Sequence, residues 1–354
     1  MSIAQLGWDR EFAERFAAKY GEEFLPARIS LEHRGLYMVM MDRGEFHAVA
    51  TGKLLFDADD RADLPVVGDW VATRIVGDSD PTVTIHGVLE RRSYVCRKEA
   101  GRKTRAQVLA ANLDMLFLVI GLDGNFNLNR VERYLALAHD SGAHPVVLLT
   151  KADLQDNVDE ILQQAQSRAG QSPVHAISVL TGIGIDGLMP YLGMGKTIAL
   201  IGSSGVGKST LLNYLIGESV QRTLEVREFD SKGRHATTHR QMFRLPSGAL
   251  IIDTPGIREL QLWDAEDGVS ETFDDIEELA RSCRFSDCQH SMEPGCAVIE
   301  ALESGELDKD RFDNYRKLRR ELAYQERKMD MNAARARNQR LRQISKISKS
   351  LKKR

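Results

Sequence analysis

The residues best suited to chemistry form a glycine-rich segment near the middle of the chain. Residues 202–209 match the pattern G-x-x-x-x-G-K-[ST] in full, after an apolar run and before a helical pattern. Backbone N–H groups of such a loop point inward and bind phosphates. Lys208 is expected to neutralise the β- and γ-phosphates, and the Ser209 hydroxyl to bind Mg²⁺. The predicted nucleotide contacts here are Gly202, Ser203, Ser204, Gly205, Val206, Gly207, Lys208, Ser209 and Thr210.

A second magnesium element is predicted where another apolar run ends, at the sequence DTPG of residues 253–256. Asp253 would hold Mg²⁺, and the Gly256 N–H would contact the γ-phosphate. The intervening segment GRHATTH, residues 233–239, has the composition of a mobile loop whose threonine closes on Mg²⁺. Spacing does not decide between its two candidate threonines, and both are predicted to act in catalysis with Lys208. The predicted magnesium ligands are Ser209, Asp253 and Thr237, with Thr238 as the alternative to Thr237.

Two short segments that precede the phosphate loop are suited to reading a guanine base. In TKAD, Asp153 would accept both hydrogens of the guanine N1–H and N2–H₂ edge, which adenine lacks. The Lys151 stem would cover the base plane. Thr150 stands where the N-K-x-D element has Asn, and offers one hydroxyl in place of an amide. Ser178 and Val179 resemble the short loop that offers a backbone N–H to guanine O6.

The order of these motifs constrains the elements that position them. In Ras-like GTPases the phosphate loop comes first and the base-reading segments last, whereas here the order is reversed. The motifs form one site only if the domain is circularly permuted. Buried-strand patterns alternate with helical patterns, which predicts an α/β domain with a mainly parallel sheet. The predicted strands are 114–120, 145–150, 174–178, 197–201, 241–245 and 249–253, and the predicted helices are 129–140, 158–168 and one starting at Lys208.

Flanking segments have different patterns. Residues 9–19 are predicted to be helical, and short runs rich in Val, Tyr, Thr and Ile at 36–41, 47–54, 67–75 and 82–90 predict a small closed sheet. The basic segment 91–113 is interpreted as a linker. The predicted domains are a helical extension 1–33, a barrel 34–105, a permuted nucleotide-binding domain 106–263, a helical zinc-binding domain 264–330 and a basic tail 331–354.

Three of the four cysteines fall within fourteen residues and include a histidine among them, in the pattern C-x4-C-x-H-x5-C. Three thiolates and one imidazole satisfy tetrahedral Zn²⁺, and the close spacing predicts a structural site. The alternative is a chance group of reduced cysteines, and Cys96 is interpreted as a free cysteine. The predicted zinc ligands are Cys283, Cys288, His290 and Cys296.

The formal net charge of −3 conceals an uneven distribution. Residues 316–354 carry 15 basic and 3 acidic side chains, whereas the remaining residues carry 33 basic and 48 acidic ones. Such a basic block predicts a tail that binds polyanions, with a merely solubilising tail as the alternative. No apolar run is long enough for a membrane span, and the N-terminus lacks a secretory signal pattern, so we expect a cytoplasmic protein without disulfides.

The motifs, taken in order, resemble those of the circularly permuted, small-ribosomal-subunit-dependent GTPases of the RsgA type. They are TKAD, SVLTG, GSSGVGKST, GRHATTH, DTPGIREL and the Cys/His cluster. The resemblance covers nearly the whole chain. It implies an N-terminal OB-fold, a permuted GTPase domain and a C-terminal zinc domain with the same four ligands. It also implies GTP hydrolysis, a role in small-subunit maturation and contacts with ribosomal RNA. We expect a monomer.

The sequence also bears on how hydrolysis proceeds. Ile257 follows the DTPG element, where Ras-like enzymes have a Gln that positions the attacking water, so slow intrinsic hydrolysis is expected. His235 and His239 are the nearest substitutes. The resemblance favours His235, although Ala236 replaces the first Thr of the family's G-R-H-T-T-T loop. The alternatives are an RNA-binding switch with negligible catalysis, and a P-loop ATPase or kinase.

Overall fold

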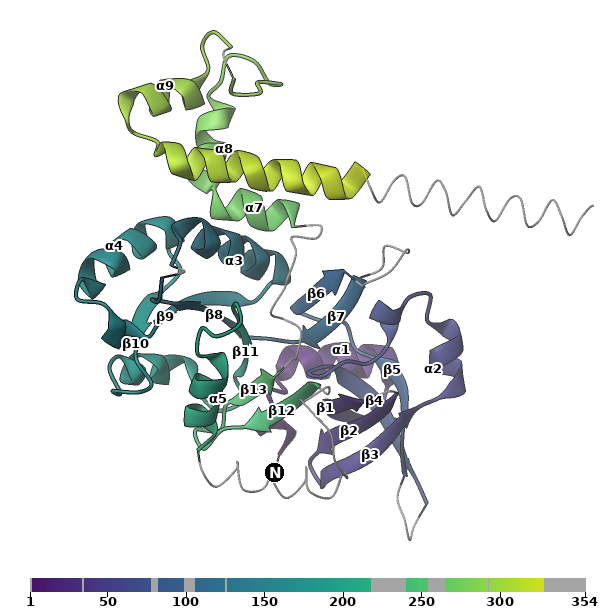
Figure 1. The fold of residues 1–354 in the computed structure, drawn as a ribbon. Helices are drawn as coiled ribbons and strands as arrows, with labels where there is room; N and C mark the ends of the chain where they lie inside the picture. Colours follow the sequence, from purple (N-terminus) through teal and green to yellow (C-terminus); the bar gives the residue numbers. More distant parts are fainter. Residues whose placement is uncertain are drawn as a thin grey trace, which may run out of the picture.

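The computed structural model describes residues 2–33, 35–77, 82–98, 106–124, 126–217, 240–253, 265–291 and 293–327. A β-barrel, a sheet covered by helices and a helical C-terminal module succeed one another along the chain (Figure 1). In the described part of the chain, no helix combines the length and apolarity needed to cross a bilayer.

A closed five-stranded barrel confirms the predicted small closed sheet. Its strands follow the order β1-β2-β3-β5-β4, and pairing of β4 with β1 closes it, which is the OB-fold arrangement. The predicted N-terminal helix is α1 (Arg10–Tyr20), and Asp9 caps it by accepting a hydrogen bond from the Phe12 N–H. The strands are β1 (Leu25–His33), β2 (Leu36–Met41), β3 (Gly44–Ala50), β4 (Trp70–Val76) and β5 (Thr82–Val88).

Three local expectations in this half of the chain differ from the structure. Residues 25–33, assigned to the helical extension, form the first barrel strand. The strand expected at 47–54 ends at Ala50, because Thr51 caps the short helix α2 (Gly52–Asp57). The expected linker contains an antiparallel pair, β6 (Tyr94–Lys98) and β7 (Ala106–Ala111).

A buried arginine explains why β1 escaped prediction. Arg28 is 2% exposed, and its guanidinium donates hydrogen bonds to the backbone carbonyls of Leu6, Gly68 and Asn112. These partners come from three separate segments of the fold. A charged side chain in a strand reads as solvent-exposed in the sequence, and only tertiary partners make its burial tolerable.

The α/β sheet confirms the predicted parallel strands. Its order is β10-β9-β8-β11-β13-β12, with only β12 antiparallel to its neighbour β13. Strand β12 also pairs with β1, so the sheet continues into the barrel. The strands are β8 (Met115–Gly121), β9 (His144–Thr150), β10 (Val174–Ile177), β11 (Thr197–Ile201), β12 (Arg240–Arg244) and β13 (Leu250–Asp253).

Both faces of this sheet are buried, as a continuous apolar strand pattern requires. Leu116 and Leu118 share a core with helices α3 (Leu128–Ser141) and α4 (Val158–Ala169). Phe117, on the opposite face, shares a core with α5 (Lys208–Ile216) and the 3-10 helix η4 (Ile185–Tyr191).

The C-terminal module packs on the outer side of α3 (Figure 1). It contains α7 (Glu266–Thr272), α8 (Asp274–Arg281), α9 (Ala297–Ser304) and a helix that includes residues 309–327, here called the C-terminal helix. Its apolar core includes Ala136 of α3, which is fully buried. The module and α3 therefore share one hydrophobic core.

Candidate functional site

The glycine-rich loop lies between β11 and α5, the context that its motif requires. Gly202 approaches β8 so closely that a Cβ would lie 2.3 Å from the carbonyl oxygen of Val119. Gly205 and Gly207 have φ values of 80° and 96°, which favour glycine. The Lys208 Nζ donates to the Gly202 carbonyl at 2.6 Å and to the carbonyl of the next residue. These two bonds hold the Lys208 ammonium against the first residues of the loop.

Thr150 connects the segment predicted to read the base, TKAD, to this loop. Its hydroxyl donates to the Val206 carbonyl at 2.6 Å, and the Ile120 carbonyl lies farther away, at 3.3 Å. A hydroxyl carries one hydrogen, so the shorter contact is the effective bond. Thr150 is 3% exposed, which shields this bond from water. A hydroxyl in place of an amide therefore still braces the phosphate loop.

The other residues that are predicted to read the base lie just after β9 and β10. Lys151 has a φ of 61°, and its Nζ lies 2.6 Å from Asp123 Oδ2, at the end of the neighbouring strand β8. Asp153 is exposed in the 3-10 helix η3 (Ala152–Leu154). The Ser178 N–H bonds to the Ile183 carbonyl at 2.9 Å and closes the loop after β10, which contains the half-buried Val179.

These motifs meet at one edge of the sheet because the parallel strands end there together. The residues predicted to read the base follow β9 and β10, whereas the glycine-rich loop follows β11, and β8 lies between β9 and β11 in the sheet. Asp253 ends β13 at the same edge, and Ser209 and Thr210 lie in the first turn of α5 there. Ligands of α/β sheets bind at the carboxyl ends of the strands, so this edge is the candidate nucleotide site.

Several predicted residues lie outside the described part of the chain. These are Gly256, His235, Thr237 and Thr238, together with the basic tail 331–354. Their roles stay predictions.

The four predicted zinc ligands come together between α8 and α9 of the C-terminal module. They are Cys283, Cys288, His290 and Cys296. Their ligand atoms all lie within 4.8 Å of one another. The sulfurs of Cys283 and Cys296 are 3.8 Å apart, and His290 Nδ1 lies 3.6 and 3.4 Å from these two sulfurs. A tetrahedron with Zn–S of about 2.3 Å and Zn–N of about 2.0 Å has edges of roughly 3.8 and 3.5 Å. The donor set therefore fits one tetrahedral metal ion.

Local structure supports this arrangement. The Arg284 N–H bonds to the Gly295 carbonyl at 3.0 Å and closes the loop between α8 and α9. His290 has a φ of 53°, an uncommon conformation for a residue with a side chain. Burial lowers the pKa of His290, which favours the neutral imidazole that a metal ligand requires. No sulfur pair in the cluster is at disulfide distance.

Sequence reasoning missed two residues of α3. The Tyr134 hydroxyl lies 3.1 Å from the Ser203 hydroxyl in the phosphate loop. Glu132 is fully buried and binds side chains of α4 and the C-terminal helix. For Glu132 the sequence offered one signal, because the helical pattern of residues 129–140 places this charged side chain on the buried face of the helix.

Replacing Thr150 by Val is expected to weaken GDP binding by about tenfold, because the Val206 carbonyl loses its donor while the side-chain volume is kept. Replacing Thr150 by Ser keeps the hydroxyl, so binding should stay near that of the unchanged chain. Calorimetric titration with GDP measures both. Equal affinities for the Val and Ser variants would contradict the bracing role.

Known proteins with similar sequences agree with the arrangement of the motifs in the structure. The sequence model of the RsgA GTPase family matches residues 88–263, and that of the ABC transporter matches residues 185–352, which include the phosphate loop. The chain is 47% identical to the small ribosomal subunit biogenesis GTPase RsgA of Opitutus terrae, over 97% of this chain and 96% of that protein. Its counterpart in Methanosarcina acetivorans is 41% identical, with coverages of 98% and 92%.

Two solved structures resemble the fold. YjeQ from Thermotoga maritima has a TM-score of 0.64 and 27% identity, over 85% of this chain and 99% of that one. YloQ, described as a circularly permuted GTPase, has a TM-score of 0.62 and 26% identity, over 86% and 97%. Full-length similarity, a permuted motif order at one sheet edge and a Cys/His cluster beyond it all agree, and the chain belongs to the RsgA GTPase family.

Proposed function

We propose that this GTP hydrolase assists the late maturation of the small ribosomal subunit, and that the bound subunit stimulates hydrolysis and is released by it. The observation that carries the enzymatic part is the convergence of Asp153, Thr150 and the phosphate loop at one sheet edge. The biological part is supported by relatives that carry the name small ribosomal subunit biogenesis GTPase and match the chain over nearly its whole length.

The nucleotide would be bound with Mg²⁺. Ser209, at the start of α5, and Asp253, at the end of β13, would hold the ion, joined by Thr237 or Thr238. The ion would neutralise charge that develops on the phosphates, while Lys208 would bind the β- and γ-phosphates.

A structural Zn²⁺ would be held by the four Cys/His ligands, with no open position for water. We also propose the domain limits predicted from the sequence, with the barrel extended to begin at Leu25.

We propose that the protein binds ribosomal RNA. The barrel, the C-terminal module and the basic segment that begins at Arg316 would contact the RNA, and the excess of basic residues in this segment is suited to binding phosphates. Affinity should then fall steeply as salt concentration rises, because each phosphate contact releases counterions. We propose a monomer that acts in the cytoplasm.

The decisive experiment measures GTP turnover by the full chain with and without purified small subunits. Stimulation by at least about tenfold is expected, since a partner that completes a GTPase site accelerates hydrolysis strongly. Large subunits serve as the control and should leave turnover unchanged. GTP-dependent binding to small subunits without any stimulation would favour the RNA-binding switch. Competition between GDP and ADP tests the ATPase alternative, and GDP should win.

Replacing His235 by Ala is expected to lower subunit-stimulated turnover by at least about 100-fold, because the group that positions the attacking water is lost. GDP affinity should stay unchanged, since the role predicted for His235 is in hydrolysis and not in nucleotide binding. His239→Ala is the matched control in the same segment. If stimulated turnover survives in His235→Ala, the assignment is wrong.

A further inference from the structure

Helix α3 contacts the phosphate-binding loop through Tyr134. The Tyr134 hydroxyl lies 3.1 Å from the Ser203 hydroxyl, and the side chain is 8% exposed. The carbonyl of Ser203 also accepts a hydrogen bond from Lys208. Side chains from outside the loop thus hold it at two points, Thr150 at Val206 and Tyr134 at Ser203.

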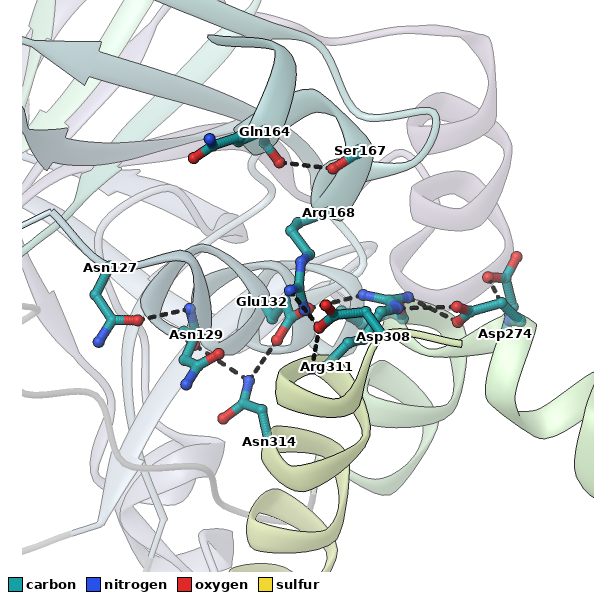
Figure 2. Close-up of polar contacts among 12 residues, drawn as sticks. Asn127, Asn129, Glu132, Gln164, Ser167, Arg168, Asp274, Asp308, Arg311 and Asn314 are labelled. Carbon is teal, nitrogen blue, oxygen red and sulfur yellow. Dashed lines mark hydrogen bonds and ion pairs between the residues drawn. The ribbon is translucent and has the colours of Figure 1, made fainter. Parts of the chain in front are cut away.

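The same turn of α3 holds the C-terminal helix through a buried carboxylate. Glu132 is fully buried, and its Oε1 accepts hydrogen bonds from Arg168 and Arg311, both at 2.9 Å. Its Oε2 accepts one from Asn314 at 2.6 Å, and Figure 2 shows these side chains converging from α3, α4 and the C-terminal helix. A buried charge that loses one partner is strongly destabilising, so this contact holds α3 and the C-terminal helix in one arrangement.

A second set of contacts fixes the other side of the cluster. Arg311 also binds the Asp275 carboxylate with two hydrogen bonds, and Arg168 binds Asp308 at 2.7 Å. Burial by itself lowers the pKa of Arg311, but the hydrogen bonds and charges of Asp275 and Glu132 raise it overall. Arg311 therefore stays charged at neutral pH.

Helix α7 packs against α3 with direct backbone contact. A Cβ on Gly268 would lie 2.1 Å from the Ala136 carbonyl oxygen and 2.8 Å from the Asp140 backbone nitrogen. Only glycine fits there.

Arg133, between Glu132 and Tyr134, forms two hydrogen bonds with Glu321 of the C-terminal helix. Three consecutive residues of α3 thus reach the phosphate loop and the C-terminal module.

We propose that α3 couples nucleotide binding at the phosphate loop to docking of the C-terminal module, with Tyr134 as the positioning residue that connects them. This inference rests on the nucleotide binding proposed above. The backbone of a helical turn is stiff. A shift in the position of α3 relative to α7 would therefore move the Tyr134 hydroxyl relative to Ser203. By linkage, GDP must strengthen docking by the same factor by which docking strengthens GDP binding.

The test is a double-mutant cycle on the full chain, with the dissociation constant for GDP as the readout. Gly268→Ala disrupts the packing of α7 against α3, because the added Cβ clashes with the α3 backbone. The substitution is expected to weaken GDP binding by about fivefold. In the Tyr134→Phe background the same substitution should have an effect of less than about twofold, because the connection is already cut. Asp267→Ala, an exposed position on the same helix, is the matched control and should change nothing. Equal effects of Gly268→Ala in both backgrounds, or none in either, would overturn the proposal.

Hydrogen exchange keeps the proposal testable if Gly268→Ala does not fold. Saturating GDP should slow exchange of the α7 amides by about fivefold in the unchanged chain. The slowing should disappear in Tyr134→Phe at GDP concentrations that saturate that variant. Slowing that persists in the variant, or is absent from the unchanged chain, refutes the coupling. Failure of the unchanged chain to bind GDP would instead refute the proposed function.

Discussion

Replacing Asp153 by Asn is expected to lower GDP affinity by a factor on the order of 10⁴, the largest effect of any single substitution at the base-reading end of the site. In the proposed role the carboxylate would accept two hydrogens from guanine, whereas the Asn amide would present one acceptor and a donor that opposes the guanine N2–H₂. Xanthine has a carbonyl oxygen in place of that amino group, so xanthosine diphosphate should bind the variant better than GDP does. Competitive titration with the two nucleotides measures the reversal.

A nearby carboxylate provides the control. Asp156→Asn removes the same charge three residues further along, at an exposed position. It should leave GDP affinity unchanged, since long-range charge at an exposed site is screened by salt. If Asp153→Asn and Asp156→Asn behave alike, Asp153 does not read the base.

Replacement of Cys296, a proposed zinc ligand, is expected to have the second large effect, which is on the stability of the C-terminal module. Structural zinc contributes on the order of 10 kcal/mol of folding free energy in small zinc domains, and Cys296 is the only buried cysteine of the cluster. Cys296→Ser should therefore lose zinc and unfold α8, α9 and the loop between them. Zinc content by elemental analysis, with hydrogen exchange of residues 274–304, measures both results.

The other domains should respond differently to this change. The α/β sheet has its own buried cores on both faces, so GDP binding should survive Cys296→Ser, reduced only by the coupling through α3. Cys96→Ser is the matched control, because Cys96 lies in the β6–β7 pair, away from the cluster. Retention of one zinc per chain by Cys296→Ser would contradict the assignment of this ligand.

Much of the α/β domain could be predicted because its signals are local. The glycines of the phosphate loop, the apolar strand runs and the helix patterns each depend on neighbours within a few residues, and predicted and observed elements agree at α3, β9, β11 and α5. The motif order also required one shared site, because a base and its phosphates are a few ångströms apart in one molecule.

Elements whose reason lies in distant partners were missed. Strand β1 contains Arg28, whose burial depends on carbonyls from three other segments. The role of Thr150 as a brace depends on the position of Val206, on a different strand–helix connection. Such contacts leave no periodic pattern in the sequence, since each partner lies at least 22 residues away along the chain.

Residue types and spacing alone determined the phosphate-loop motif, the permuted order and the four members of the Cys/His cluster, and they predicted the carboxylate that would read guanine, because each is a short pattern with one plausible chemistry. Tertiary structure alone decided that Glu132 is buried, that Tyr134 touches Ser203, and that Gly268 lies against α3. The physical reason is that burial and close approach are properties of packed pairs. A buried carboxylate and an exposed one are the same letter in a sequence, and only the fold supplies the arginines that make the difference.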